Sequence, residues 1–422
     1  MKRVSQHLYI LSTLFVLATT CLLASCRDDK DEPQPAEQSA GRPGEVLDYS
    51  IILYIAGENT LSNYVALDLN EIVEGCATLP SDARVVAFVD DTRSSRLYAG
   101  TADAPLKIVK TYDGNICSTD SASMTSILKE IIEGYPAKHY GLVLWSHASG
   151  WVMRDNNVTS APRRSFGYDN GQRSSVNNKG PQMNIPQLAN ILAKFPHFEY
   201  ILFDACFMQC VEVAYELRNV TDYIIGSPAE IPGHGAPYHE ILAKLCSTGD
   251  DIGQVVDVYN DYYADANSDG YDIYGGVELS MVKTSKLEAL AAATAPLMQQ
   301  ILAGRQSPDC SGVQRYNPDD TYIFTHKIYT EYFDLQHLIY TTLPAADYAQ
   351  WLPAFEAAVP KPAKSPRWYS GLTQKSEYIV DPEHCGGVSI FVPSSRYDAL
   401  GWNERYHSME WYSATGLEQT GW

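Results

Sequence analysis

The sequence predicts an α/β protein whose largely parallel sheet is covered by helices on both faces. Short, continuous apolar runs, typical of buried strands, alternate with segments whose apolar residues recur at helical spacing. Strands and helices that alternate in this way build βαβ units and parallel sheets. The 422 residues, 45% apolar and 19% charged, also have the composition of a globular protein.

The predicted elements follow one another along the chain. Strands are expected at 49–55, 84–89, 140–145, 200–203 and 222–226, and helices between them at 61–76, 123–134, 185–195 and 208–217. The second half is more helical, with helices at 255–263, 285–302, 333–340 and 348–359 and strands at 277–282 and 387–392. Ligands of parallel sheets bind at the carboxyl ends of strands, so those ends are where a functional site is expected.

The first residues indicate export. Lys2 and Arg3 precede an apolar run that is too short to span a membrane comfortably. The run ends in Leu23-Ala24-Ser25-Cys26, which looks like a bacterial lipobox with Cys26 as the lipidated residue. An ordinary signal peptide with a chance cysteine is the alternative. We therefore interpret residues 1–25 as a lipoprotein signal peptide, which leaves Cys26 as the new N-terminus.

Residues 26–47 are polar and rich in Pro and Gly, which predicts a flexible tether. Its acidic start resembles the surface-export tether of Bacteroidetes lipoproteins, so we expect an outer-membrane lipoprotein that the tether could direct to the cell surface. After the tether we expect a core over 48–248 and a C-terminal subdomain over 249–422 that completes the fold.

The net charge excludes some functions. The chain has 31 Lys and Arg against 51 Asp and Glu, a formal charge of −20. This argues against nucleic-acid binding, which needs a basic surface, and against polybasic adhesion to anionic lipid. It suits a protein that attracts basic partners.

Two strand ends carry side chains suited to catalysis. His147 follows the strand at 140–145, and Asp204-Ala205-Cys206 follows the strand at 200–203. On adjacent strands, a His could activate the thiol and later protonate a leaving group, while the next helix would lower the thiol pKa. Inert residues that stand at strand ends by chance are the alternative. Cys210 could form a disulfide or a metal-binding pair with Cys206, although a position of Cys210 in the core is favoured.

These motifs resemble those of the clostripain-type cysteine peptidases. The resemblance runs from about Tyr49 to Trp422 and is carried by segments 54–61, 144–151, 203–208, 223–238, 332–335 and 411–417. It implies a caspase-like fold with a six-stranded sheet and C-terminal additions. It also implies a cysteine endopeptidase that cleaves peptides or proteins after Arg, and after Lys as a second choice.

The resemblance assigns a role to each matching residue. His147 is expected to be the general base and acid, Cys206 the nucleophile, and the amides of Ala148 and Cys206 the oxyanion donors. Asp204 is expected to line the S1 pocket, which holds the substrate residue before the cut bond; a purely local hydrogen-bonding role is the alternative. Most relatives have Gly at the position of Ala148, and strain there would weaken catalysis if the site needs a positive φ. A lipoprotein that uses the fold only for binding is the competing hypothesis.

The interval between the two motifs is unusually basic. It contains Arg154, Arg163, Arg164, Arg173 and Lys179. Relatives mature by cutting themselves after a basic residue in this interval, so we expect cleavage at Arg163 or Arg164; an uncut, solvated loop is the alternative. No metal-binding motif occurs and no cofactor is expected to be required. Some relatives use Ca²⁺, and the sequence leaves that question open.

Overall fold

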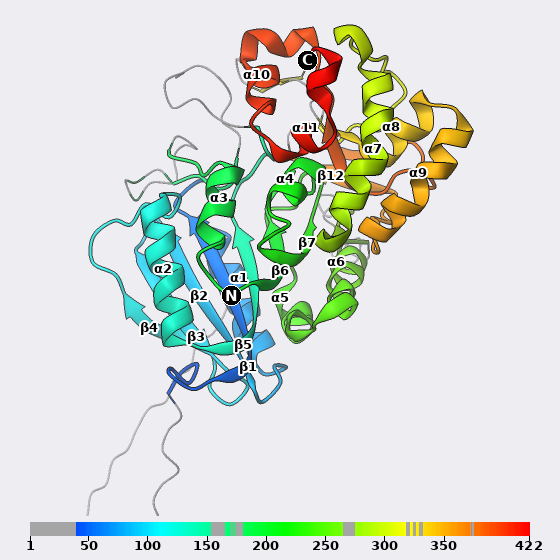
Figure 1. Cartoon of the computed structure of the whole chain (residues 1–422). Helices are drawn as coiled ribbons and strands as arrows, with labels where there is room; N and C mark the ends of the chain where they lie inside the picture. The colour runs from blue at the N-terminus through cyan, green and yellow to red at the C-terminus, as the bar shows by residue number, and fades with distance from the viewer. Residues whose placement is uncertain are drawn as a thin grey trace, which may run out of the picture. The chain divides into compact units, whose positions relative to one another are not determined.

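An eight-stranded sheet forms the centre of the protein, as the computed structural model shows (Figure 1). The strands are β1 (Leu47–Gly57), β2 (Ala83–Asp91), β3 (Ser95–Gly100), β4 (Lys107–Thr111), β5 (Ala137–Trp145), β6 (Phe198–Asp204), β7 (Thr221–Gly226) and β8 (Ser280–Lys283). Their order is β4-β3-β2-β1-β5-β6-β7-β8. The five central strands are parallel, whereas β3, β4 and β8 pair antiparallel at the two sides.

The structure describes residues 39–152, 165–169, 171, 173, 180–264, 275–317, 321–323, 326–328, 332–371, 373 and 375–422. The chain from Gln38 to Trp422 forms one compact unit. Strand β8 lies beyond residue 248 and completes the sheet by pairing with β7. The predicted division at residue 248 stays a prediction. No helix within the described ranges is long and apolar enough to cross a bilayer.

Helices cover both faces of the sheet. On one face α1 (Val65–Cys76), α5 (Tyr238–Ile241) and α6 (Gln254–Ala264) pack on Ile51, Leu53 and Ile55 of β1. On the other face Ile52, Tyr54 and Ala56 meet the helices α2 (Ser121–Gly134), α3 (Ile185–Leu192) and α4 (Val211–Glu216). Alternate residues of β1 therefore enter two separate cores, which explains its continuous apolar run.

The C-terminal helices extend the second core. They are α7 (Leu287–Ile301), α8 (Leu335–Thr342), α9 (Ala345–Ala358), α10 (Trp402–Tyr406) and α11 (Glu410–Ala414). Small two-stranded sheets pair β9 (Thr321–Ile323) with β10 (His326–Ile328), β11 (Tyr332–Asp334) with β14 (Ser389–Phe391), and β12 (Arg367–Ser370) with β13 (Lys375–Tyr378).

The predicted α/β class and largely parallel sheet are confirmed, and the helix bounds lie within a few residues of those expected. The six-stranded sheet implied by the resemblance is wrong, because the sheet has eight strands. Strands β3 and β4 were not predicted from the sequence. Strand β4 is exposed along its whole length, so it has no buried apolar run to reveal it. The strand predicted at 387–392 exists as β14 but lies outside the main sheet.

Candidate active site

The two candidate strand ends lie side by side. Strands β5 and β6 are parallel neighbours whose register pairs Trp145 with Asp204. His147 and Cys206 each follow two residues beyond that pair and line the same pocket of about 330 Å³. The other residues around it are Leu61, Trp145, Ser146, Ala148, Asp204, Ala205, Phe207, Glu230, Ile231, Pro232, Gly233 and Gly235. The structure thus brings His147, Ala148, Asp204 and Cys206 together.

The Cys206 thiol is protonated at neutral pH in this structure. Burial raises its pKa to about 12, and the negative charges of Glu230 and Asp204 add to the rise. The amide of Ile231 donates to the sulfur at 3.4 Å, which acts in the opposite direction. The expectation of a lowered thiol pKa is therefore wrong for this state. Helix α4 begins only at Val211, whereas the sequence predicted that this helix starts at Met208.

The His147 imidazole is neutral and can accept a proton. Burial lowers its pKa to about 4. Its Nε2 lies 2.8 Å from the hydroxyl of Thr60, and the ring of Tyr168 packs against it edge-on at 5.6 Å. Among the described residues, the imidazole forms its hydrogen bond with Thr60 and none with Cys206. The site is therefore a neutral pair at rest, not a thiolate–imidazolium pair.

Backbone strain lies next to the thiol and not at Ala148. Ala148 is outside the left-handed region, so the strain considered for a residue other than Gly at that position does not arise. Phe207, directly after Cys206, has a φ of 62°, a conformation that costs on the order of 1–3 kcal/mol. Its amide donates to the carbonyl of Ala229 at 2.9 Å and its ring stacks on Tyr332 at 5.9 Å. These contacts hold the turn that presents the thiol.

Asp204 is a buried carboxylate in the wall of the pocket. Its Oδ2 accepts from the Ala236 amide at 2.9 Å and the Tyr238 hydroxyl at 2.8 Å, and its Oδ1 accepts from the Tyr259 hydroxyl at 3.1 Å. Burial raises its pKa, while these hydrogen bonds lower it. A Cβ on Gly235, where φ is 64°, would lie 2.7 Å from Oδ2. The glycine therefore leaves room for the carboxylate.

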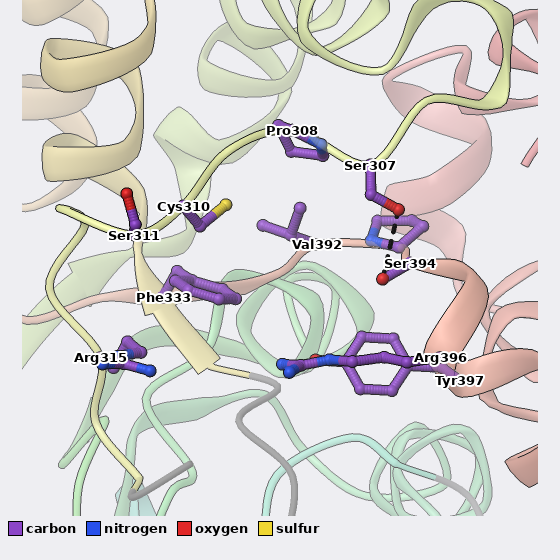
Figure 2. Close-up of a pocket in the computed structure, with 11 residues that line it drawn as sticks. Ser307, Pro308, Cys310, Ser311, Arg315, Phe333, Val392, Ser394, Arg396 and Tyr397 are labelled. Carbon is purple, nitrogen blue, oxygen red and sulfur yellow. Dashed lines mark hydrogen bonds between the residues drawn. The ribbon is translucent and has the colours of Figure 1, made fainter. Parts of the chain in front are cut away.

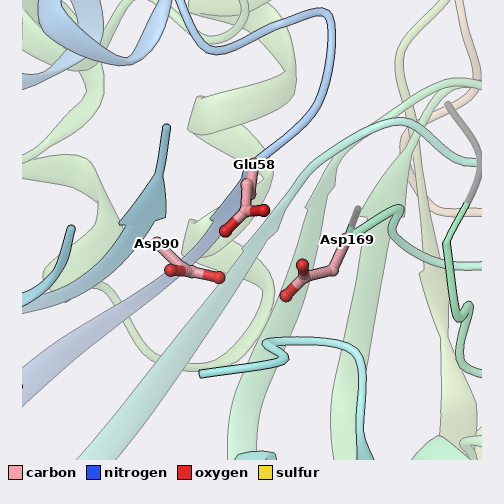
Figure 3. A group of neighbouring side chains, drawn as sticks. All are labelled: Glu58, Asp90 and Asp169. Atoms are coloured by element: carbon pink, nitrogen blue, oxygen red, sulfur yellow. The ribbon is translucent and has the colours of Figure 1, made fainter. Parts of the chain in front are cut away.

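A second group of carboxylates lies where β1 and β2 end. Figure 3 shows Glu58, Asp90 and Asp169 with their oxygens facing one another, and one oxygen from each lies within 4.8 Å of the others. Carboxylate oxygens are ligands that Ca²⁺ prefers. However, Arg173 donates to Asp90 Oδ1 at 2.6 Å and pairs with Glu58 at 3.2 Å. A guanidinium thus supplies positive charge to this cluster. Sequence reasoning missed it because its members come from distant segments without a spacing motif.

The described cysteines form no disulfide. Cys76, Cys117, Cys206, Cys210, Cys246, Cys310 and Cys385 are all free, and Cys210 is buried in the core as favoured. Cys310 lines a separate pocket of about 370 Å³ beside Phe333, Arg315 and Arg396 (Figure 2). That pocket includes none of the predicted site residues. Cys26, Arg154, Arg163, Arg164 and Lys179 lie outside the described residues.

Comparison with known proteins identifies the family. A model described as the clostripain family matches residues 53–420. The chain belongs to the clostripain family. No curated protein matches it.

Solved structures of the same class share its fold. A secreted C11 cysteine protease from Bacteroides thetaiotaomicron, in complex with an irreversible peptide inhibitor, is 30% identical with a TM-score of 0.72; the match covers 88% of this chain and 99% of that one. An inactive zymogen C11 protease from Parabacteroides distasonis is 28% identical with a TM-score of 0.70 and the same coverage. A B. fragilis cysteine protease is 33% identical with a TM-score of 0.51, over 57% of this chain and 96% of that one.

These findings confirm the predicted family and the caspase-like α/β fold. Membership in the clostripain family supports cysteine peptidase activity on peptide or protein substrates. One similar protein is described as secreted, which agrees with export of this clostripain-family chain.

The ion pair of Arg173 predicts a pH-dependent stability. Burial, together with the charge of Asp169, raises the pKa of Asp90 to about 7, against about 3.9 in an unfolded chain. The stability that a raised carboxyl pKa contributes is present below about pH 4 and is lost as the pH rises toward 7. Arg173 opposes this loss, because its hydrogen bond to Asp90 favours the charged form of that carboxylate.

We therefore expect Arg173→Gln to lower the melting temperature more at pH 8, where Asp90 is ionised, than at pH 5. Thermal unfolding at the two pH values measures this, with the exposed Lys194→Gln as a matched control. An equal effect of Arg173→Gln at both pH values would contradict the role of the ion pair.

Proposed function

We propose that this protein is a cysteine endopeptidase that cleaves after Arg and Lys through a Cys206–His147 dyad. The observation that carries the proposal is the common pocket. A thiol, a neutral imidazole and a buried carboxylate, all from the ends of β5 and β6, line it together. Thiol, base and a specificity-determining acid are the groups that such a cleavage needs.

The resting protonation states determine the order of events. Because the thiol and imidazole are both neutral, the Cys206 proton passes to His147 as the sulfur attacks the substrate carbonyl. His147 then gives that proton to the leaving amine as the C–N bond breaks, and water hydrolyses the thioester. The hydrogen bond between Nε2 and Thr60 must give way, or the ring must turn, before the first transfer.

The oxyanion of the tetrahedral intermediate needs donors already in place. We assign this role to the backbone N–H groups of Cys206 and Ala148, which both line the pocket. Ala148 keeps the N–H that a glycine would supply. Loss of one such donor typically costs about 2.7–4 kcal/mol of transition-state stabilisation.

Asp204 supplies the preference for a basic side chain. Three hydrogen bonds fix the orientation of its carboxylate, and it lies in the pocket wall two residues before the thiol. A desolvated carboxylate binds a guanidinium or ammonium group through charge-assisted hydrogen bonds. The formal charge of −20 adds a long-range attraction for basic peptides.

Hydrolysis of a peptide panel varied at P1 tests this assignment. We expect cleavage after Arg and Lys only, no activity in Cys206→Ala, and a loss of about 10–100-fold in kcat/KM on basic substrates in Asp204→Asn. Asp113→Asn, at an exposed position, is the matched control and should keep full activity. A wild type inactive on every peptide, before and after limited trypsin cleavage between the two motifs, would favour the binding-module hypothesis.

We further propose that the enzyme cuts its own chain at Arg163 or Arg164. This linker lies between the two motifs and carries the substrate residues that Asp204 would accept. N-terminal sequencing should find a new end at Ser165 or Arg164 in the wild type and an intact chain in Cys206→Ala. An uncut wild type would refute self-processing while leaving the peptide assay to judge activity.

Lipid attachment at Cys26 completes the proposal, and it rests on the lipobox-like Leu23-Ala24-Ser25-Cys26. We expect labelled fatty acid to enter the wild type and not Cys26→Ala, with the wild type in the outer-membrane fraction. Equal recovery of both proteins in the soluble fraction, without label, would refute the anchor.

A further inference from the structure

Asp68, on the buried side of α1, is a carboxylate without an evident structural purpose. Its residue is only 1% exposed, and neither carboxylate oxygen has a hydrogen-bond partner within the described part of the chain. Buried carboxylates normally have partners, because an unsatisfied one loses its hydration without compensation. The Trp145 indole favours the charged form but makes no hydrogen bond of regular geometry to it. A buried carboxylate without regular hydrogen bonds therefore needs an explanation.

Asp68 belongs to the same acidic group as Asp204. The hydroxyl of Tyr238 donates to Asp204 at 2.8 Å, and the amide of Tyr238 donates to Glu71 of α1 at 2.9 Å. Burial is the main cause that raises the pKa of Tyr238 and of Tyr263 on α6, and the neighbouring carboxylates add to the rise. Asp68 also interacts with the indole of Trp145, which lines the pocket and is the register partner of Asp204, so Asp68 lies behind the wall of the candidate S1 pocket.

The surroundings of Asp68 favour its neutral form. Burial raises its pKa to about 9, and the charges of Asp204 and Glu71 add to this. From α5, His239 pairs with Glu71 at 3.2 Å, and from α6 the phenol of Tyr259 donates to Asp204. A proton on Asp68 therefore relieves the repulsion within the acidic group at neutral pH.

Asp204 alone is poorly equipped to receive a guanidinium. A carboxylate offers about four lone-pair positions, and three hydrogen bonds already use the oxygens of Asp204. A guanidinium brings five N–H donors and a full positive charge into a pocket with little water. A second negative charge nearby would compensate the lost hydration of that cation.

We propose that Asp68 is a second acidic group behind the wall of the S1 pocket, which releases its proton to solvent when the cationic side chain of an Arg or Lys substrate enters. This inference rests on the proposed function. Trp145 and Asp204 line the pocket and Asp68 does not, so Asp68 acts as a positioning residue. It contributes its charge through the pocket wall. The positive charge that enters is balanced by the proton that leaves, so the pocket never holds two uncompensated carboxylates.

Proton release on binding tests the inference. In the Cys206→Ala protein, titration calorimetry at pH 7 in two buffers with different ionisation enthalpies compares two peptides that differ only in Arg or citrulline at P1. The Arg peptide should release up to about one proton more than the citrulline peptide. Adding Asp68→Asn should abolish that difference and weaken Arg-peptide binding about tenfold, with citrulline-peptide binding unchanged. Adding Glu74→Gln, at an exposed position of the same helix, should change neither.

Equal proton release with both peptides would overturn the role of Asp68, and that measurement needs no Asp68 variant to fold. A proton difference that survives Asp68→Asn would also overturn it. Failure of the proposed function looks different. In that case wild-type enzyme would not prefer Arg over citrulline at P1, which would overturn the pocket assignment and this inference with it.

Discussion

The parallel register of β5 and β6 is the constraint on which the rest of the site depends. It pairs Trp145 with Asp204 and so fixes which residues emerge at the sheet edge. A shift of one residue would turn the side chains of either strand to the opposite face. The buried apolar faces of both strands prevent that shift, since each face enters its own core. The common pocket of His147 and Cys206 is therefore a consequence of how the two cores are filled.

Burial, more than any single ion pair, determines the chemistry at this edge. It lowers the pKa of His147 and raises those of Cys206, Asp204 and Asp68. Each shift favours the neutral form, so the resting site avoids charge wherever it can. In the proposed reaction, charge is therefore separated only when substrate is present. The same preference for neutral groups links the proposed thiol attack, in which a proton would move to His147, with the proton release proposed for Asp68.

The sequence predicted the parts of the site that follow from strand periodicity. Continuous apolar runs located β5 and β6, and the polar residues just beyond them gave His147, Asp204 and Cys206. The thiol pKa was misjudged because burial dominates it, and periodicity does not show which distant residues, such as Glu230 and Ile231, surround Cys206. The acidic cluster of Glu58, Asp90 and Asp169 joins three distant segments, so no local sequence pattern predicts it. Asp68 did leave a signal: it interrupts the apolar face formed by Val65, Leu69 and Ile72 of α1.

The residues that follow the proposed cleavage site contact the loop that carries His147. Phe166 bridges to both Ala148 and Met183, and the amide of Gly167 donates to the His147 carbonyl at 2.9 Å. Asn59 donates to the Tyr168 carbonyl at 3.0 Å, and Arg173 contacts the carboxylates after β1 and β2. A cut after Arg164 lies before all of these contacts. The residues that support the His147 loop would therefore keep these contacts after the proposed cleavage.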